Sequence, residues 1–391
     1  MTTDLAAAAA DQLHAGDRGT YCEIGPDRAS VQGLWSSCLC ALGLARTDES
    51  RAWTEIETLF AHQWPDGMVP HLVFHGGPER MGAEAGLWDS GRAVPTSGLS
   101  QSPLAGLVLR HLFETATDRA AAEARLRALL PRVSAWHRWF QRARDPRGEG
   151  LVAILHPCES ARPWSQDWAV ALDRLPQAPP PPLHLVSPAR PPPDPRRLAL
   201  IAQYRDLHWD TDLLHDAAPF RLVDPGTNAV LIRSAMDLAD LAERLGEPGI
   251  AAENRALALR GLNALERLWS EDQGGYLVWD RVRGARQDPV SIGGLLPVLC
   301  AIPAPRIRRI AATLAGQGAR GGGETAGLAE TWLLAGSLAR AGETALAADL
   351  ARAALAAIRP GVPGPADAAP PRWPSAAAAA MVLELLALGQ G

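Results

Sequence analysis

The stretch that decides the fold is Leu34-Trp35-Ser36-Ser37-Cys38-Leu39-Cys40-Ala41-Leu42-Gly43-Leu44-Ala45, which is apolar on almost every side. A helix with one face in water would carry charged residues at a period of about 3.6, and this stretch carries none. We therefore expect residues 34–45 to form an inner helix that other helices enclose. The next segment, Trp53–Ala61, is amphipathic instead, as expected for a helix with one side in water.

The same alternation of apolar and charged helices continues to the carboxyl end. Short Gly, Pro or Asp loops separate many of the segments. Besides a first helix in residues 1–13, we expect helices at residues 104–113, 120–142, 198–207, 227–244, 250–269, 292–300, 306–314, 327–340, 344–357 and 375–388. Such a succession of hairpins predicts an all-α double ring. A solenoid would show a sequence repeat of about 34–45 residues, and none is evident.

Length alone favours two domains, because 391 residues exceed the usual size of one. No boundary divides the chain, however, so we predict a single domain over residues 1–391. Its one low-complexity stretch, Leu175–Arg196, is rich in proline and therefore cannot be helical. We interpret residues 175–196 as a loop that crosses one mouth of the ring, with an interdomain linker as the alternative.

Composition excludes several classes of function. The formal net charge is −5 and the arginines are scattered among acidic residues, which argues against nucleic-acid binding. No apolar run approaches the roughly 18 residues that span a bilayer, and the amino-terminal residues lack the basic region of a signal peptide. Five irregularly spaced cysteines suit reduced thiols rather than a disulfide framework. We expect a cytoplasmic protein with no membrane partner.

Several motifs follow one another in a fixed order. They are Leu34-Trp35-Ser36-Ser37-Cys38, Leu59-Phe60-Ala61-His62-Gln63, Asp66-Gly67-Met68-Val69-Pro70-His71, Thr96-Ser97-Gly98-Leu99-Ser100-Gln101-Ser102-Pro103, Leu155-His156-Pro157-Cys158-Glu159-Ser160 with Trp168, and Pro219-Phe220-Arg221-Leu222-Val223-Asp224 with Asn228. This ordered set resembles glycoside hydrolase family 63, in particular the bacterial branch that cleaves mannosylglycerate and glucosylglycerate. The resemblance covers nearly the whole chain and implies an (α/α)6 toroid with a pocket at one end.

The resemblance also implies an inverting glycosidase, which needs a carboxylic acid and a carboxylate about 6.5–9.5 Å apart. The family pattern around the acid reads His-Pro-Trp-Glu-Ser-Gly-x-Asp-Asn-Ser-Pro-x-Trp-Asp. Laid on residues 156–169 without gaps, this pattern places its catalytic Asp on Pro163, which has no proton to donate. Asp167, four residues further on, is the candidate for a displaced acid.

Two further positions depart from the family pattern. The second carboxylate belongs to a Glu-Tyr segment before the last helix, but residues 359–365 contain no glutamate. Asp367, Glu324 and Glu330 are the candidates for a displaced base. At the start of the chain, the family's Trp-Asp-Ser reads Trp35-Ser36-Ser37, and a serine cannot replace the two charge-assisted hydrogen bonds that an aspartate accepts from sugar hydroxyls.

The remaining residues still describe a pocket for a small polar molecule. Its candidate binding residues are Trp35, Ser36, Trp64, Gln101 and Trp168. Its candidate catalytic residues are His156, Glu159 and Asp167, since a buried His–Glu pair can act as acid and base near neutrality. Each tryptophan is equally well explained as a core residue, and His156 as a buried histidine with a hydrogen-bond partner.

Metal and cofactor motifs are missing from the sequence. His62, His71 and His75 do not have the spacing of a His-ligated metal site, and Gly321–Gly323 lacks the lysine of a P-loop. We therefore expect no metal and no cofactor. Three functions stay open: a glycosidase with relocated carboxylates, a sugar-binding protein without hydrolysis, and an acid/base enzyme with a different small substrate. The sequence leaves the oligomeric state open.

Overall fold

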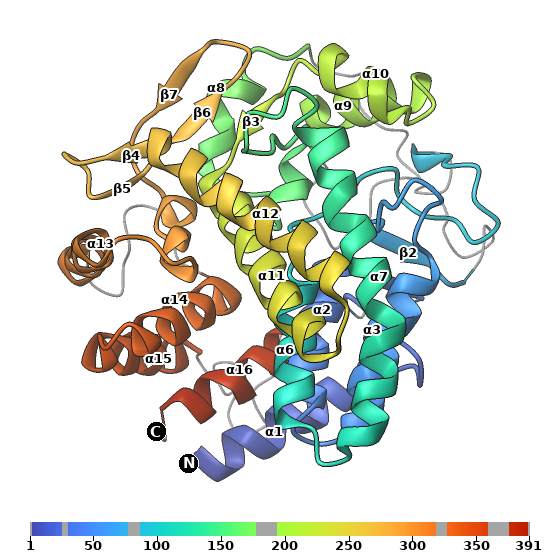
Figure 1. Cartoon of the computed structure of the whole chain (residues 1–391), viewed down its shortest axis with the longest axis vertical. Helices are drawn as coiled ribbons and strands as arrows, with labels where there is room; N and C mark the ends of the chain where they lie inside the picture. The colour runs from blue at the N-terminus through green and yellow to red at the C-terminus, as the bar shows by residue number, and fades with distance from the viewer. Residues whose placement is uncertain are drawn as a thin grey trace, which may run out of the picture.

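An inner ring of six elements forms the frame of the protein. The structure is a computed structural model that describes residues 2–25, 30–76, 87–176, 194–317, 327–358 and 375–389. Within these ranges each inner element contacts the next, and the last contacts the first. In chain order they are α2 (Leu34–Leu44), α6 (Ala105–Thr115), α11 (Pro225–Arg244), the 3-10 turn η6 (Leu296–Leu299), α14 (Leu328–Arg340) and α16 (Ala376–Leu388) (Figure 1). This closed ring confirms the predicted all-α (α/α)6 toroid.

An outer layer of helices surrounds the ring. Each outer helix precedes one inner element along the chain, which gives six hairpins in the described residues. The outer helices are α1 (Thr2–Ala15), α3 (Glu49–Ala61), α7 (Arg119–Arg144), α12 (Pro248–Leu265), α13 (Ala304–Gln317) and α15 (Thr344–Ala357). The hydrophobic and charged faces of these helices separate as the sequence predicts, whereas α2 and α16 are buried on nearly all sides.

Side-chain caps decide where many of the helices begin. An aspartate that precedes a helix accepts hydrogen bonds from the first free backbone N–H groups, which have no partner within the helix. The aspartates that do so here are Asp48 before α3, Asp118 before α7, Asp194 before α9 (Pro195–Asp206), Asp210 before α10 (Thr211–Ala217) and Asp224 before α11. Ser375 caps α16 in the same way.

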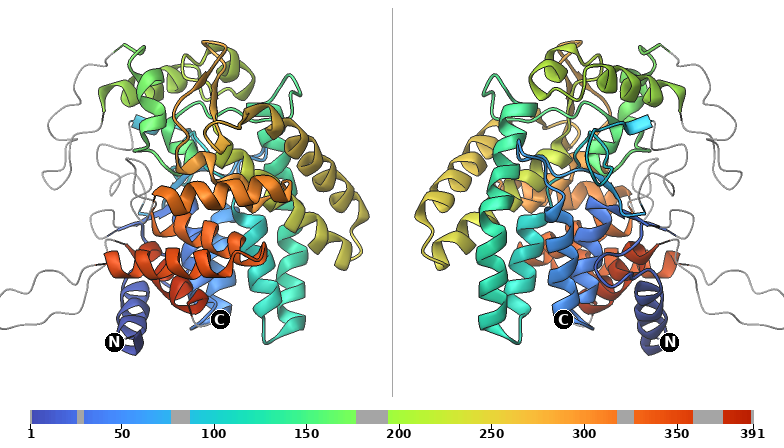
Figure 2. Two further views of the ribbon diagram at one scale, coloured as in Figure 1. Left: turned by 90° about the vertical axis from the view of Figure 1, so that its left-hand side faces the viewer. Right: turned by 90° about the vertical axis from the view of Figure 1, so that its right-hand side faces the viewer.

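Short antiparallel strands lie in the loops between hairpins. Strand β1 (Val31–Gly33) pairs with β2 (Leu72–Phe74), and β4 (Trp269–Ser270) pairs with β5 (Gly275–Tyr276). A third sheet has the order β3 (Leu222–Val223), β6 (Val278–Asp280), β7 (Ala285–Gln287). The third sheet lies with α8 (Ala169–Leu172), α9 and α10 at the top of Figure 1, and both termini lie at the opposite end of the molecule (Figure 2).

The fourth inner element differs from the prediction. Residues 292–300 were expected to be one helix, but they form two 3-10 turns, η5 (Ile292–Gly294) and η6. A Cβ atom on Gly294 would lie 2.1 Å from the carbonyl oxygen of Tyr276, so the chain must pass the β4–β5 hairpin closely here. Pro297 also removes a backbone donor that a continuous helix would use. The expectation of a helix was therefore wrong.

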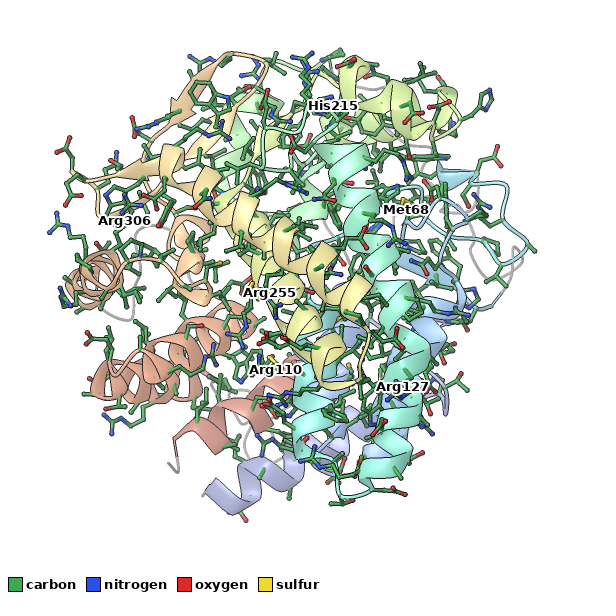
Figure 3. The ribbon with its side chains drawn as sticks, in the orientation of Figure 1. Met68, Arg110, Arg127, His215, Arg255 and Arg306 are labelled. Carbon is green, nitrogen blue, oxygen red and sulfur yellow. The ribbon has the colours of Figure 1, made fainter. Side chains whose placement is uncertain are left out.

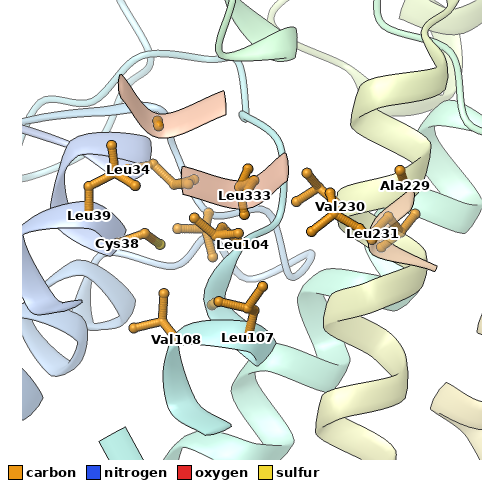
Figure 4. Close-up of a cluster of buried hydrophobic side chains, with 14 of the residues drawn as sticks. Leu34, Cys38, Leu39, Leu104, Leu107, Val108, Ala229, Val230, Leu231 and Leu333 are labelled. Atoms are coloured by element: carbon orange, nitrogen blue, oxygen red, sulfur yellow. The ribbon is translucent and has the colours of Figure 1, made fainter. Parts of the chain in front are cut away.

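Side chains of the inner helices fill the centre of the ring. Leu34 and Cys38 of α2 face Leu107 and Val108 of α6, with Leu333 of α14 beside them (Figure 4). The backbones approach so closely that glycine is required at the contacts. A Cβ atom on Gly106 would lie 2.1 Å from the carbonyl oxygen of Ser234 on α11, and one on Gly43 would lie 2.6 Å from Cβ of Ala380 on α16.

A buried histidine joins the outer layer to the ring. Asn254 on α12 donates from Nδ2 to Ser134 and to the carbonyl of Ile250, so its Oδ1 accepts from Nδ1 of His137 at 2.7 Å. The other ring nitrogen, Nε2, then accepts from the hydroxyl of Ser234 at 3.0 Å. Burial lowers the pKa of His137 from 6.5 to about 4, although the bond to Asn254 opposes the shift. Through these two hydrogen bonds, the neutral ring of His137 joins α7 to both α11 and α12.

Substitution of Gly106 by alanine tests the close approach of α6 and α11. We expect G106A to lower the free energy of unfolding by about 3 kcal/mol, because the new methyl group meets a backbone oxygen that cannot move without the helix. The control is Gly316→Ala, on the exposed side of α13, where a Cβ atom meets nothing within 4 Å. G316A should instead gain about 0.5–1 kcal/mol from helix propensity. Urea unfolding of both variants checks the pair, and equal effects would contradict the packing account.

Acid should weaken the fold through His137. The pKa of His137 is lower in the folded protein than in the unfolded chain, so the unfolded chain takes up the proton first. The stability that the neutral ring contributes is complete above pH 6.5 and is lost as the pH falls towards 4. The full difference is on the order of 3 kcal/mol. We expect His137→Gln to lose less stability than the wild type between about pH 7 and about pH 4.5.

The exposed His14 provides the control for this pH experiment. His14→Gln should follow the wild-type curve of unfolding free energy against pH. A His137→Gln curve as steep as that of the wild type would show that the histidine is not held neutral.

Candidate active site

The amino ends of the inner helices meet at one end of the ring, which we call the amino-terminal mouth. The backbone N–H of Trp35, in the first turn of α2, donates to Oε1 of Gln101 at 3.1 Å. Ser102, next to Gln101, hydrogen-bonds Thr227 in the first turn of α11 at 3.2 Å and the carbonyl of Glu159 at 3.3 Å. Three helix starts and the loop at Glu159 are thereby held together.

Three of the predicted binding residues lie together at this mouth. Trp35, Ser36 and Gln101 are all half-buried, so each keeps part of its side chain accessible. Trp35 and Ser36 begin α2 because the chain turns there from strand β1 into the helix. Gln101 comes from the loop before α6, and its amide oxygen fixes the start of α2. Indole, amide and hydroxyl groups are of the kinds that bind a polyhydroxylated ligand.

The other two predicted tryptophans are engaged elsewhere. Trp64 follows α3, donates from Nε1 to Thr96 at 3.1 Å, and has the guanidinium of Arg92 over its ring at 4.1 Å. Trp168 is fully buried, donates to the carbonyl of Arg162 at 2.7 Å and packs edge-on against Phe220. Trp168 therefore acts as a core residue beneath the site.

Glu159 forms a fully buried ion pair with Arg144 at the end of α7. The closest atoms, Nη2 of Arg144 and Oε1 of Glu159, are 2.6 Å apart, and both side chains are 1% exposed. The second carboxylate oxygen accepts from the backbone N–H of Leu155 at 2.7 Å. The guanidinium also stacks over the ring of Trp139 at 4.5 Å. Glu159 thus orders the loop before η1 (Pro157–Ser160) and is almost completely buried.

His156 begins the same 3-10 turn but has different partners. Its Nδ1 accepts a hydrogen bond from the backbone N–H of Cys158 at 3.1 Å, so the ring caps η1 in the way a serine or aspartate would. Burial and the nearby charge of Arg197 lower the pKa of His156 to about 3. The ring is therefore neutral, and in the described residues it makes no hydrogen bond to Glu159.

Asp167 belongs to a network that centres on Arg162. Its Oδ2 accepts from Nη1 of Arg162 at 3.2 Å and from the hydroxyl of Ser291 at 2.6 Å. The other end of the guanidinium donates to Asp224 at 2.8 Å, and Asp224 also caps α11 and accepts from Thr227. This network joins the loop of η2 (Gln166–Trp168), the start of α11 and η5. Pro163 and the exposed Trp164 follow Arg162 in this loop.

The remaining candidates lie outside these clusters. Glu324, Asp367 and residues 359–365 fall outside the described residues, as does most of the proline-rich loop at 175–196. Glu330 is buried in the first turn of α14. His62 and His75 have ring centres 5.1 Å apart, while His71 pairs with Ser97 instead. In the part of the chain that the structure describes, no three metal-binding side chains gather, and no helix could span a membrane.

Sequence reasoning missed the two arginines that organise the site. Arg144 ends a long outer helix, and Arg162 occupies the variable position of the family pattern, so neither carries a motif. A buried glutamate or aspartate in a predicted loop needs a cation. This need is the only feature of the sequence that points to the two arginines.

Comparison with known proteins supports the resemblance to glycoside hydrolase family 63. Residues 30–324 match the family model described as the mannosylglycerate hydrolase MGH1-like glycoside hydrolase domain. The chain is 37% identical over 315 residues to a mannosylglycerate hydrolase of Thermus thermophilus, covering 75% of this chain and 73% of that protein. It is 36% identical over 299 residues to the hydrolase MGH1 of Selaginella moellendorffii, covering 74% of this chain. The alignment spans only 61% of the Selaginella protein.

Solved structures agree over almost the whole chain. The family 63 mannosylglycerate hydrolase of Thermus thermophilus, crystallised with Tris and D-glycerate, superposes with a TM-score of 0.87 at 32% identity and covers 97% of this chain and 99% of its own. The chain belongs to glycoside hydrolase family 63. Neutral trehalase Nth1 of Saccharomyces cerevisiae, with 12% identity and a TM-score of 0.61, shares the fold alone.

The family 63 loop at residues 156–168 is thus held by buried charges on both sides. Glu159 pairs with Arg144 at its beginning, and Arg162 pairs with Asp167 and Asp224 at its end. Because each of these charges is at least nine-tenths buried, removal of one partner would leave the other charged and desolvated.

Substitution of Glu159 tests whether it holds this loop. We expect Glu159→Gln to lower the free energy of unfolding by about 3–5 kcal/mol, because Arg144 would remain charged in a dry site. The matched control is Glu123→Gln, whose partner Arg127 lies on the exposed face of α7. That loss should be below about 0.5 kcal/mol. Thermal and urea unfolding of both variants measures these changes. A small loss of unfolding free energy in E159Q would contradict a structural role for the buried pair.

Proposed function

We propose that this member of family 63 binds a small glycoside at the amino-terminal mouth and does not hydrolyse it by the two-carboxylate mechanism. The observation that carries this proposal is the Arg162 network. It occupies the loop in which the family pattern has its catalytic acid, and Pro163 stands at that position. An inverting hydrolase needs a proton donor there, and the side chain of proline has none.

The nearby acidic groups support the same conclusion. Glu159 forms an ion pair with Arg144, and Oδ2 of Asp167 accepts hydrogen bonds from two donors. The neutral His156 caps a turn through its own Nδ1. These side chains serve as structural acceptors, which leaves Trp35, Ser36 and Gln101 to contact a ligand.

The ligand class follows from the relatives. The named relatives are mannosylglycerate and glucosylglycerate hydrolases, and solved structures of the Thermus enzyme hold D-glycerate or glucose. We therefore propose a hexose, alone or linked to a small acid, as the ligand. We also propose that residues 1–391 act as one domain in the cytoplasm, a location that the five free thiols support.

A second candidate is an acid/base enzyme that acts on a different small molecule. Asp167 is the observation in its favour, because no described residue donates a hydrogen bond to its Oδ1. This oxygen would be the proton acceptor in an isomerisation or elimination.

Incubation with mannosylglycerate and glucosylglycerate tests the proposal, with the Thermus thermophilus hydrolase as positive control. We expect no release of hexose from the purified protein, since Pro163 cannot protonate the leaving oxygen. We expect glucose or one of the glycosides to raise the melting temperature in a saturable way, because only the folded protein binds it. Hexose release that Asp167→Asn abolishes would overturn the proposal and identify a relocated acid.

Two variants assign the binding to the amino-terminal mouth. Gln101→Ala should weaken glucose or glycoside binding about tenfold, in line with the loss of one or two hydrogen bonds. Gln203→Ala, at a half-buried glutamine of α9 whose amide donates to the carbonyl of Ala217, should leave the melting shift unchanged. If no sugar shifts the melting temperature, or if both variants behave alike, the binding site lies elsewhere.

A further inference from the structure

A cavity lies at the carboxyl ends of the inner helices. Its volume is about 850 Å³, which is within the range of small-molecule sites. The cavity is bordered by α6, α11, α14 and α16, with α12 and α13 beside them, and none of Trp35, Ser36 and Gln101 lines it. We call it the carboxyl-terminal cavity.

The short fourth inner element explains why this cavity exists. Turn η6 ends at Leu299, whereas α11 extends to Arg244 and α14 to Arg340 on either side. A full inner helix would carry side chains into the space between them. Instead, the cavity keeps an apolar wall that can cover the body of a ligand. This wall consists of Leu107, Ile232, Leu262, Val298, Trp332 and Leu388.

The carboxylates of the cavity are already neutralised. Arg110 of α6 (labelled in Figure 3) pairs with Asp237 at 2.9 Å, with Asp240 at 3.1 Å and with Glu114 at 3.0 Å. Arg233 adds a second bond to Asp237 at 2.7 Å. Arg46 likewise pairs with Glu384. A metal ion or an organic cation would therefore have to break an existing ion pair in order to bind.

Arg340 is the exception among these arginines. It donates to the hydroxyl of Ser337 at 3.0 Å, and among the described residues no carboxylate lies within ion-pair distance of it. Its side chain is exposed where it lines the cavity. Partial desolvation there, followed by the positive charge of Arg233, lowers the pKa of Arg340 to about 10. Arg340 ends α14, so the partial negative charge of its own helix favours the cation.

We propose that the carboxyl-terminal cavity binds a small organic anion whose carboxylate or phosphate group pairs with Arg340. A guanidinium presents parallel N–H donors that match two oxygens of such a group. The anion would supply the counter-charge that Arg340 lacks, and its carbon skeleton would pack against Trp332 and Leu262. The site is separate from the amino-terminal mouth and does not rest on the function proposed for that mouth.

Calorimetric titration of the full chain with glycerol 3-phosphate and with succinate tests this site. These anions separate phosphate from carboxylate recognition, and uncharged glycerol shows what the carbon skeleton contributes alone. We expect saturable binding of at least one anion and none of glycerol. We expect Arg340→Gln to weaken that binding about 10- to 100-fold, as for the loss of a charged hydrogen-bonding group. Arg340→Lys should retain part of the affinity because it keeps the charge.

Matched variants separate this result from a general effect of charge or of the other site. Arg352→Gln removes an exposed arginine from α15 and should leave anion affinity unchanged. Gln101→Ala should also leave it unchanged, while Arg340→Gln should leave the melting shift with glucose intact. The proposal is overturned if neither anion binds, or if Arg340→Gln and Arg352→Gln bind the anion equally. Because Arg340 is exposed where it lines the cavity, R340Q without ligand should melt close to the wild type.

Discussion

The whole molecule depends on how closely the inner helices approach one another. At Gly106 the backbone of α6 lies against the carbonyl oxygen of Ser234, and at Gly43 the backbone of α2 lies against Ala380. Larger residues at these positions would push neighbouring helices apart, and a ring with a wider joint would not close. Closure in turn fixes both ends of the toroid. It brings the amino ends of α2, α6 and α11 together, where the hydrogen bond from Trp35 to Gln101 forms.

Much of this frame is predictable because local sequence patterns determine where the helices lie and begin. Residues 34–45 lack charge on every side, which predicts an enclosed helix, and an aspartate stands before many of the helices as a cap. Residues 292–300 show where prediction from local patterns fails. They are apolar like an inner helix, but Gly293, Gly294 and Pro297 produce turns that fit around Tyr276. Apolar composition reports burial, and it cannot distinguish a buried helix from a buried turn when the segment is short.

The candidate site was predictable only where spacing within a motif fixes geometry. Trp35 and Gln101 belong to motifs at the starts of two inner helices, so their proximity follows from the toroid. The positions of the partners of Arg162 do not follow from any motif. Asp224 lies 62 residues away along the chain, and Ser291, which hydrogen-bonds Asp167, lies 124 residues from it. Such pairs depend on the tertiary fold, and the sequence around them carries no sign of which arginine will be buried.

The short turns of the fourth hairpin affect both ends of the ring. At the amino end, η5 brings the guanidinium of Arg162 so close that a Cβ atom on Gly293 would lie 2.1 Å from Nη2. The same turn presents Ser291 to Asp167. At the carboxyl end, the early termination of η6 leaves the space that Arg340 lines. A continuous helix over residues 292–300 would displace the arginine network and fill the cavity together. The two ends of this protein are therefore physically linked by one departure from helical structure.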